Sequence, residues 1–549
     1  MTESVSSSSV ALRGGIENLM SWAQSFSVDE LQLELVEADS AHLDADASNS
    51  IPLRCVEVLR LLPGRRVVCR GWLGDAPVVI KWFLGAGSQR YQRRELLGCQ
   101  ALTQTGVPTP TLLRAFDFVS LARASADEDH SGCALVFDYL PGAQDLTDQH
   151  LVARPELFKE LWRMLARMNE AGVIHQDLHL GNLMCDGESL WIIDGDSVAR
   201  PQQTPLGVRD SAANFVNLAA QTRESQSFEQ LTAHWLDYCD ARHHEGHQSG
   251  GRPFDSAAVS KASLLRKYRR ARRARVLHFQ AKTQRNCSAY ANRRTVLGDA
   301  LLDRTWLQAR CADHSLEDGS GKLDEAQLGR EMLSWLDDLP RLMDGRDDQV
   351  GEIVKRGNTA TVVAASFRGE RLIVKRYNNK SNWHRVRRMF SGDRGLNSWI
   401  YAHTLAFTGI AGSEAVALLR TRLGGPTYLV MRQAEGAELD PEQLENTVSS
   451  VSPDAFERVS RELLALLGRL AAEGLVHGDT KASNFLWDSE STSLTLIDLD
   501  SMRMPAWRRA RRRGHERDRR RLLRNFAATP ELQRRLGSLM DTTASKTPG

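Results

Sequence analysis

The sequence predicts an α+β fold of two tandem domains, each with a small β-rich lobe followed by a larger helical lobe. Three observations predict this arrangement. A polar motif in which an Asp lies five positions before an Asn occurs twice, at residues 173–182 and 475–484. Each copy is followed by a short apolar run that ends in another Asp. Each copy is also preceded by a strand-like run with one lysine and then by an amphipathic helix.

The first copy carries the residue types that phosphoryl transfer requires. An Asp can orient an acceptor hydroxyl and take its proton, and we assign this role to Asp177. Amide and carboxylate oxygens hold the magnesium ions that neutralise the transferring phosphate, and Asn182 and Asp194 have the expected spacing. The apolar run 190–193 is expected to form the hairpin that fixes Asp194. These residues predict a protein-kinase-like domain that uses ATP and Mg²⁺.

The second copy repeats the first with a hairpin that is two residues longer. Asp479 is the expected catalytic residue, and Asn484 and Asp498 are the expected metal ligands. Two coincidental polar loops are the alternative, which the lysine upstream of each copy disfavours. Lys481 lies two positions after Asp479, where a cation can steady the transferring phosphate. The first half has His179 there, which need not be charged at neutral pH.

Length and composition agree with a reduced, two-domain protein. A chain of 549 residues accommodates two kinase-like domains, and its net charge of +2 gives no overall attraction to polyanions. The eight cysteines form no CxxC pair, which favours reduced thiols over a zinc ribbon or a disulfide framework. We find neither a signal-peptide pattern nor an apolar run of about 20 residues. We therefore expect a cytoplasmic protein.

The composition divides the chain into five segments. The predicted segments are 1–48, polar and partly disordered; 49–240, the first kinase-like domain; 241–344, a basic helical extension and linker; 345–530, the second kinase-like domain; and 531–549, a C-terminal tail.

The first small lobe contains a candidate nucleotide-binding pair. Residues 78–81 read as a buried strand that ends in Lys81, which is expected to reach the α- and β-phosphates of ATP. Glu95 lies on a predicted helix over 89–105 and is expected to hold Lys81 in place. The alternatives are a strand-edge lysine that points to water and a solvated helix glutamate.

The second small lobe repeats the lysine but not the glutamate. Residues 371–375 form the corresponding strand and end in Lys375. Aligning the helix ends at residues 102–107 and 405–410 places Ser398 opposite Glu95. Asp196 and Asp500 follow the predicted metal ligands by two positions, and we regard them as weaker candidates for metal binding.

Two basic segments, 261–275 and 503–524, contrast with the near-neutral whole. Each is either a solvated helix face or a surface for an anionic partner, and for 503–524 the partner we consider is an anionic membrane surface reached by peripheral contact. No motif supports specific nucleic-acid binding.

Several of these stretches resemble the bacterial lipopolysaccharide core kinases, and the resemblance covers most of residues 50–230 and 345–530. It implies a protein-kinase-like fold, use of ATP and magnesium, and a cytoplasmic location. It also implies that the acceptor is a lipid-linked core oligosaccharide whose heptose or Kdo sugars are phosphorylated at the inner leaflet. The stretches that carry the resemblance are residues 62–66 (LPGRR), 106–110 (GVPTP), 175–182 (HQDLHLGN), 355–362 (KRGNTATV) and 477–484 (HGDTKASN).

Two other functions remain open on the sequence. A Ser/Thr protein kinase would place phosphate on protein instead of glycolipid. A pseudokinase scaffold in one or both halves would lack magnesium-dependent nucleotide binding. Because Glu95 has no counterpart in the second half, we expect Asp177→Ala to lose more activity than Asp479→Ala.

Overall fold

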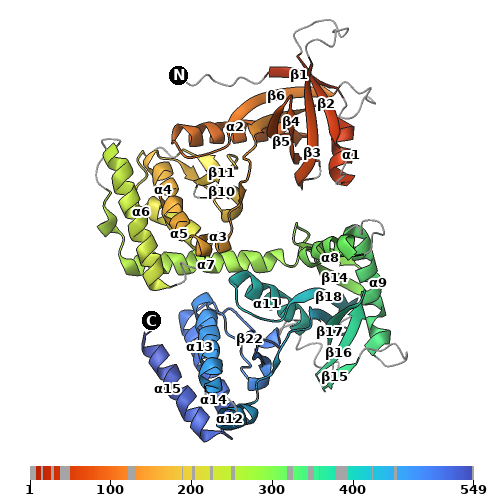
Figure 1. Cartoon of the computed structure of the whole chain (residues 1–549), viewed down its shortest axis with the longest axis vertical. Coiled ribbons are helices and arrows are strands. Elements are labelled where there is room, and N and C mark those ends of the chain that lie inside the picture. Colours follow the sequence, from red (N-terminus) through yellow and green to blue (C-terminus); the bar gives the residue numbers. More distant parts are fainter. Residues whose placement is uncertain are drawn as a thin grey trace. The chain divides into compact units, whose positions relative to one another are not determined.

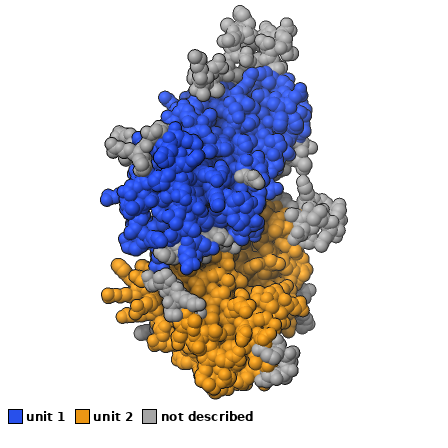
Figure 2. All heavy atoms as spheres, turned by 60° about the vertical axis from the view of Figure 1, so that its left-hand side comes forward, with its two compact units in different colours: residues 1–271 blue, residues 272–549 orange. Residues whose placement is uncertain are grey.

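The structure is a computed structural model that divides into two compact units, residues 1–271 (unit 1) and 272–549 (unit 2), coloured separately in Figure 2. Figure 1 labels most of the helices and many of the strands of both units. The described residues are 8–13, 16–25, 30–37, 50–62, 64–120, 131–187, 189–200, 204–222, 227–248, 254–317, 325–343, 352–357, 359–378, 393–422, 425–450 and 454–546.

Unit 1 begins with a closed barrel in the strand order β1-β2-β3-β4-β5-β7-β6. All pairs are antiparallel except β1 with β6. Buried aromatic side chains fill it, with the rings of Phe116 and Phe118 edge-on to Trp82. The strands are β1 Ser8–Arg13, β2 Leu31–Glu37, β3 Ser50–Leu62, β4 Arg66–Leu73, β5 Ala76–Leu84, β6 Leu112–Ser120 and β7 Ser131–Asp138.

The first 48 residues differ from the expected polar, partly disordered segment. Where the structure describes them, they supply β1, β2 and the helix α1, Ile16–Ser25. Leu19, Trp22, Leu33 and Leu35 are buried in the barrel core. The scattered apolar residues of this segment are therefore core residues, because burial of their side chains offsets the entropy lost on ordering.

The helix α2, Ser88–Gln104, follows the barrel strand β5, and a mainly helical region follows β7. A core built from α4, α5 and α6 supports the polar motif in this region. Its elements are β8 Gln144–Asp145, α3 Asp148–Ala153, α4 Glu156–Glu170, β9 Ile174–His175, η2 Leu180–Asn182, β10 Leu183–Asp186, β11 Ser189–Ile192, β12 Val198–Ala199, α5 Val208–Ala219, α6 Phe228–Gln248, η4 Ser256–Ala258 and α7 Lys261–Lys282.

Unit 2 is built around a seven-stranded antiparallel sheet in the order β13-β14-β18-β19-β17-β16-β15. The helix α11, Arg394–Thr408, packs against it. The remaining elements of this part are β13 Tyr290–Arg294, β14 Gly298–Asp303, α8 Arg304–Glu317, α9 Glu325–Met343, β15 Ile353–Arg356, β16 Ala360–Phe367, β17 Glu370–Tyr377, β18 Ala415–Thr421 and β19 Thr427–Arg432.

The segment 241–344, expected to be an extension and linker, is divided between the two units. The boundary falls within α7, between Ala271 and Arg272. Strand β14 pairs with β18, and its Leu302 is buried among sheet residues. The apolar run of β14 is too short to identify a strand from periodicity, and pairing with a strand more than 100 residues later decides its conformation.

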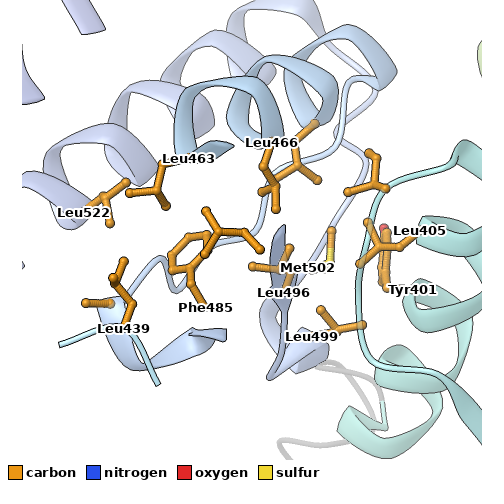
Figure 3. Close-up of a cluster of buried hydrophobic side chains, with 14 of the residues drawn as sticks. Tyr401, Leu405, Leu439, Leu463, Leu466, Phe485, Leu496, Leu499, Met502 and Leu522 are labelled. Carbon is orange, nitrogen blue, oxygen red and sulfur yellow. The ribbon is translucent and has the colours of Figure 1, made fainter. Parts of the chain in front are cut away.

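The helical part of unit 2 surrounds the second polar motif. Buried side chains from α11, α13 and the motif's own hairpin converge there, with Leu405, Phe485 and Leu499 among them (Figure 3). The elements are β20 Ala437–Glu438, α12 Pro441–Ser450, α13 Ala455–Glu473, η6 Ala482–Asn484, β21 Phe485–Asp488, β22 Ser493–Leu496, η7 Leu499–Ser501, α14 Arg508–Asn525 and α15 Pro530–Lys546.

The predicted α+β class is confirmed: the described residues form helices and mainly antiparallel strands. Among the described residues, none of the helices combines the length and the apolar character that crossing a membrane would require. The eight cysteines are free thiols, six of them buried.

Candidate active site

Unit 1 brings the strand lysine, the helix glutamate and the hairpin aspartate together. Lys81 on β5 forms a buried ion pair with Glu95 on α2. Its Nζ also donates to the carbonyl oxygen of Ile193 at 2.9 Å and lies 4.0 Å from Asp194 Oδ1. Glu95 Oε1 further accepts from the amide of Gly195 at 3.2 Å. Glu95 thus connects the lysine to the backbone that presents Asp194.

The charges in this cluster stabilise one another. Burial alone would lower the pKa of Lys81, but the carboxylates of Glu95 and Asp194 outweigh it and the pKa is raised. Burial would likewise raise the pKa of Asp194, yet Lys81 and hydrogen bonds lower it to about 2. Lys81 is therefore an ammonium and Asp194 a carboxylate at neutral pH.

The candidate catalytic loop of unit 1, residues 175–182, is hydrogen-bonded to the same hairpin. Asn182 Nδ2 donates to the carbonyl oxygen of Asp177 at 3.0 Å, and the Asn182 carbonyl accepts from the amide of Ile193 at 3.1 Å. His175 Nε2 lies 2.7 Å from the carbonyl oxygen of Asp194. The Asp177 side chain is 72% exposed, with His179 Nε2 3.9 Å away. The loop therefore fixes the backbone of Asp177 and leaves its carboxylate accessible.

Unit 2 arranges its lysine differently. Lys375 Nζ on β17 lies 2.6 Å from Asp498 Oδ1, and the ammonium also stands 5.1 Å from the ring centre of Tyr377. The hydroxyl of Ser398, which the sequence alignment sets opposite Glu95, lies 2.8 Å from the Tyr377 hydroxyl. Burial would raise the pKa of Asp498, but Lys375 outweighs it and lowers the pKa. Lys375 thus binds the candidate metal ligand without a glutamate between them.

The candidate catalytic loop of unit 2, residues 477–484, has the same Asn-to-backbone hydrogen bond as its counterpart in unit 1. Asn484 Nδ2 donates to the carbonyl oxygen of Asp479 at 2.7 Å. The Asp479 carboxylate differs from that of Asp177 because two cations lie close to it. Arg521 Nη2 is 2.5 Å from Oδ1, and Lys481 Nζ is 3.8 Å from Oδ2.

A buried aspartate on α14 binds the candidate catalytic loop of unit 2. Asp518 Oδ2 accepts from the amide of His477 at 2.9 Å, and its Oδ1 accepts from the amide of Gly478 at 3.0 Å. Its backbone carbonyl accepts from the hydroxyl of Thr480 at 2.6 Å. Helix α14 therefore positions the loop on both sides of Gly478, whose φ of +86° favours glycine.

Asp518 and Arg521 contact the candidate site, and the sequence analysis missed both. Both lie within the basic segment 503–524, which was expected to be a solvated face or a surface for an anionic partner. The sequence contained one indication of this role: Asp518 is an acidic residue within an arginine-rich segment, where a carboxylate can bind a specific partner. The other basic segment is also partly structural, since Arg272 forms a buried ion pair with Glu473.

The donor set suits magnesium together with a nucleotide. Asn182 and Asn484 each use the amide nitrogen for the loop and leave the amide oxygen available. Asp194 and Asp498 add one carboxylate per unit, and magnesium commonly takes one or two carboxylates plus phosphate oxygens. In the described parts of the chain, no group of three His, Cys, Asp or Glu side chains forms a self-sufficient metal site.

Comparison with known proteins shows a family likeness within unit 2. Residues 342–542 match the model of the Lipopolysaccharide kinase (Kdo/WaaP) family. The resemblance predicted from the sequence is therefore confirmed for this region, which lies within unit 2 and contains Lys375, Asp479, Asn484 and Asp498.

Particular relatives agree with that class. The chain is 33% identical over 99 residues to a 3-deoxy-D-manno-octulosonic acid kinase of Stenotrophomonas maltophilia (strain R551-3), covering 18% of this chain and 37% of the relative. It is 31% identical over 119 residues to the enzyme of that name from Vibrio cholerae serotype O1 (strain ATCC 39315 / El Tor Inaba N16961), covering 21% and 47%. The chain thus spans less than half the length of these curated relatives.

A solved structure of WaaP in complex with acyl carrier protein is also similar, with 20% identity and a TM-score of 0.28. The match covers 39% of this chain and 86% of that one.

Proposed function

We propose that the chain is an ATP- and magnesium-dependent phosphotransferase with two protein-kinase-like units, and that its acceptor is a sugar hydroxyl of the lipopolysaccharide inner core. The observation that carries the proposal is the repeated placement of a strand lysine near a hairpin aspartate, beside a loop in which an Asn binds the backbone of an Asp. The family match and the named relatives support the kinase class and the sugar acceptor.

Each residue has a distinct role in this proposal. Lys81 and Lys375 orient the phosphates of ATP, and Asp177 and Asp479 orient the acceptor hydroxyl and accept its proton. Lys481 stabilises negative charge on the transferring phosphate. The metal would be held in unit 1 by Asn182 and Asp194 and in unit 2 by Asn484 and Asp498. Magnesium, when bound, neutralises charge on the phosphate oxygens.

The acceptor reaction is assigned to unit 2. The absence of a glutamate opposite Glu95 favoured unit 1 on the sequence. The family match lies in unit 2, and Asp479 has Lys481 beside it where Asp177 has only a histidine. On these two observations we propose a ranking of the halves opposite to the one expected from the sequence.

Phosphate transfer from ATP labelled at the γ-position to purified core oligosaccharide tests the proposal. In the full-length chain, Asp479→Ala should lower the rate by about 10²–10⁴-fold, because the acceptor loses its base. Asp177→Ala, the matched variant in the other unit, should lower it less. Magnesium-dependent nucleotide binding should persist in both variants and serves as the folding control.

Three outcomes would redirect the proposal. Label on protein instead of oligosaccharide supports a Ser/Thr protein kinase. Absence of magnesium-dependent nucleotide binding to the wild-type chain supports a scaffold without kinase activity. A larger loss in Asp177→Ala than in Asp479→Ala assigns the reaction to unit 1.

We also propose a cytoplasmic location with peripheral contact between α14 and an anionic membrane surface. The face of α14 opposite Asp518 carries exposed arginines, and the adjacent Trp507 is 79% exposed. Exposed tryptophan beside cations is typical of a membrane interface, and each cation near such a surface contributes about 1 kcal/mol. Arg509→Glu with Arg513→Glu should abolish sedimentation with anionic vesicles, whereas Arg534→Glu on α15 should not. Binding to zwitterionic vesicles of equal strength would contradict this contact.

A further inference from the structure

The second acid of each Asp-x-Asp pair contacts the helix that follows the strand lysine. In unit 1, Asp196 Oδ1 lies 3.2 Å from Arg94 Nε on α2, and the carbonyl oxygen of Asp196 accepts from Arg94 Nη2 at 3.1 Å. Arg66 on β4 lies 3.8 Å from Asp196 Oδ2. One arginine thus binds both the side chain and the backbone of Asp196, and a second arginine faces the other carboxylate oxygen.

Unit 2 forms the corresponding contact from different residues. Arg394 on α11 forms an ion pair with Asp500 Oδ2. Asn397 occupies the position of Arg94 and donates from Nδ2 to the carbonyl oxygens of Asp500 and Met502, each at 3.0 Å. In unit 1, Arg94 binds both the carboxylate and the backbone of Asp196. In unit 2, Arg394 binds the carboxylate of Asp500 and Asn397 binds its backbone.

In each unit an arginine lies over an aromatic ring and against the second aspartate of the pair, but it comes from a strand in unit 1 and from a helix in unit 2. Arg66 is opposite Phe83 in the strand register, and its guanidinium stands 5.3 Å from the centre of that ring. In unit 2 the residue opposite Tyr377 is Ala360, which has no charge. Arg394 instead stands 5.4 Å from the Tyr377 ring. A cation over this ring and against this carboxylate is thus present in both units, although the sequence supplies it from a strand in one and from a helix in the other.

The carboxylates of Asp196 and Asp500 are occupied by protein groups. The Asp500 side chain is 5% exposed, with Arg394 at Oδ2 and the hydroxyl of Ser501 donating to Oδ1 at 3.1 Å. The Asp498 side chain is 34% exposed and faces Lys375. Within the pair Asp498 and Asp500, therefore, Asp498 is the residue whose carboxylate a metal could approach.

The two units differ in how many charged ties hold this helix. In unit 1, α2 is bound to the hairpin region through both Lys81–Glu95 and Arg94–Asp196. Unit 2 has no counterpart of the Lys81–Glu95 pair, because a serine, Ser398, stands opposite Glu95 and its hydroxyl bonds to Tyr377. In the described part of unit 2, α11 is instead bound to the loop after Asp498 by the Arg394–Asp500 ion pair and by the hydrogen bonds from the Asn397 amide.

We propose that Asp196 and Asp500 are positioning residues that dock α2 and α11 against the metal-binding loop, and that in unit 2 the Arg394–Asp500–Asn397 contact replaces the missing lysine–glutamate pair. The inference rests on the proposed function only in calling that loop metal-binding. It explains how unit 2 holds Lys375 and Asp498 together although it lacks a counterpart of Glu95.

Hydrogen exchange of the full-length chain tests the docking without requiring catalysis. Asp500→Asn and Arg394→Gln should each speed exchange of the amides of α11 by about tenfold or more, and the double variant should add little to either. Asp196→Asn, the matched change in unit 1, should affect α2 less because Lys81–Glu95 remains. Combining Asp196→Asn with Glu95→Gln should speed amide exchange in α2 as much as Asp500→Asn speeds it in α11. Exchange in α13 is the control for unfolding of unit 2, and Arg394→Lys replaces Arg394→Gln if α13 also loses protection.

Magnesium titration of nucleotide binding separates docking from metal ligation. A docking role predicts that Asp500→Asn and Arg394→Gln weaken nucleotide binding equally at saturating Mg²⁺. Unchanged exchange in α11, together with a raised magnesium requirement in Asp500→Asn alone, would overturn the proposal and make Asp500 a ligand. If the wild-type chain transfers no phosphate, the proposed function fails, while the exchange result still decides the docking.

Discussion

Lys375 Nζ lies 2.6 Å from Asp498 Oδ1, whereas its counterpart Lys81 is paired with a buried glutamate and lies 4.0 Å from Asp194. The same sequence pattern thus produces two electrostatic arrangements in one chain. Removing either lysine leaves a different charge behind, and the cost depends on whether water can reach that charge.

The two lysines should therefore differ in their contribution to stability. Lys81→Met leaves Glu95, which is fully buried, without its cation and should cost unit 1 about 3 kcal/mol. Lys375→Met leaves Asp498, which is partly exposed, and should cost unit 2 about 1 kcal/mol. Hydrogen exchange of the slowest amides in each unit measures both values. Equal losses would contradict the assigned role of Glu95.

A glycine on α2 should be essential for the approach of that helix to the hairpin. A Cβ on Gly98 would lie 1.8 Å from the carbonyl oxygen of Gly195, which is backbone and cannot rotate away. Gly98→Ala should destabilise unit 1 by about 1–3 kcal/mol and weaken nucleotide binding there. Gly468→Ala on α13 is the matched control, since a Cβ there meets nothing within 4 Å and should be neutral or stabilise by about 1 kcal/mol. Thermal unfolding and nucleotide titration are the measurements. Equal effects of the two variants would contradict the requirement for glycine at position 98.

The carboxylate of Asp518 should be required for the catalytic loop of unit 2. Asp518→Ala leaves the buried amide of His477 without its acceptor, at about 1–3 kcal/mol, and the part-buried amide of Gly478 loses its acceptor at a smaller cost. Asp518→Asn keeps one acceptor oxygen and should lie between wild type and alanine. Glu516→Ala, two residues away on the surface of α14, removes only an ion pair with Arg520 and should have little effect. Phosphate transfer to core oligosaccharide and unfolding by denaturant are the measurements, and full activity in Asp518→Ala would refute the positioning role.

Acid should weaken unit 2 through His403. This side chain is buried against Tyr290 and Trp399, with Asp303 Oδ2 3.8 Å from its Nδ1, and burial lowers its pKa to about 3. The unfolded chain binds a proton near pH 6.5 that the folded unit rejects until about pH 3, so the free energy of unfolding falls as the pH decreases below about 6.5.

The expected loss from His403 is about 2 kcal/mol between pH 6.5 and 5, because each pKa unit corresponds to about 1.4 kcal/mol. His403→Gln should remove this part of the pH dependence, whereas replacing the exposed His247 with Gln should leave it in place. Hydrogen exchange of α11 at the two pH values gives the comparison. Identical pH dependence in wild type and His403→Gln would exclude His403 as the cause.

Sequence determined the local chemistry of the candidate site. The spacing of Asp and Asn in the two loops, the apolar hairpins and the strand lysines are short-range features, and the structure places Lys81, Glu95 and Asp194 together as that spacing implied. The absence of a glutamate opposite Glu95 was also readable by counting along the helix. Such features follow from periodicity and from which side chains can hold a charge or a metal.

Only the tertiary structure decided which long-range partners complete the site. Asp518 and Arg521 reach the catalytic loop from a helix 40 residues later, and Arg394 replaces a strand arginine that unit 2 lacks. The strands β1 and β14 likewise pair with distant strands, β6 and β18. The physical reason is the same in each case: a side chain or strand edge that is neutral in its local context gains stability only when a remote segment supplies the matching charge, hydrogen bond or apolar surface.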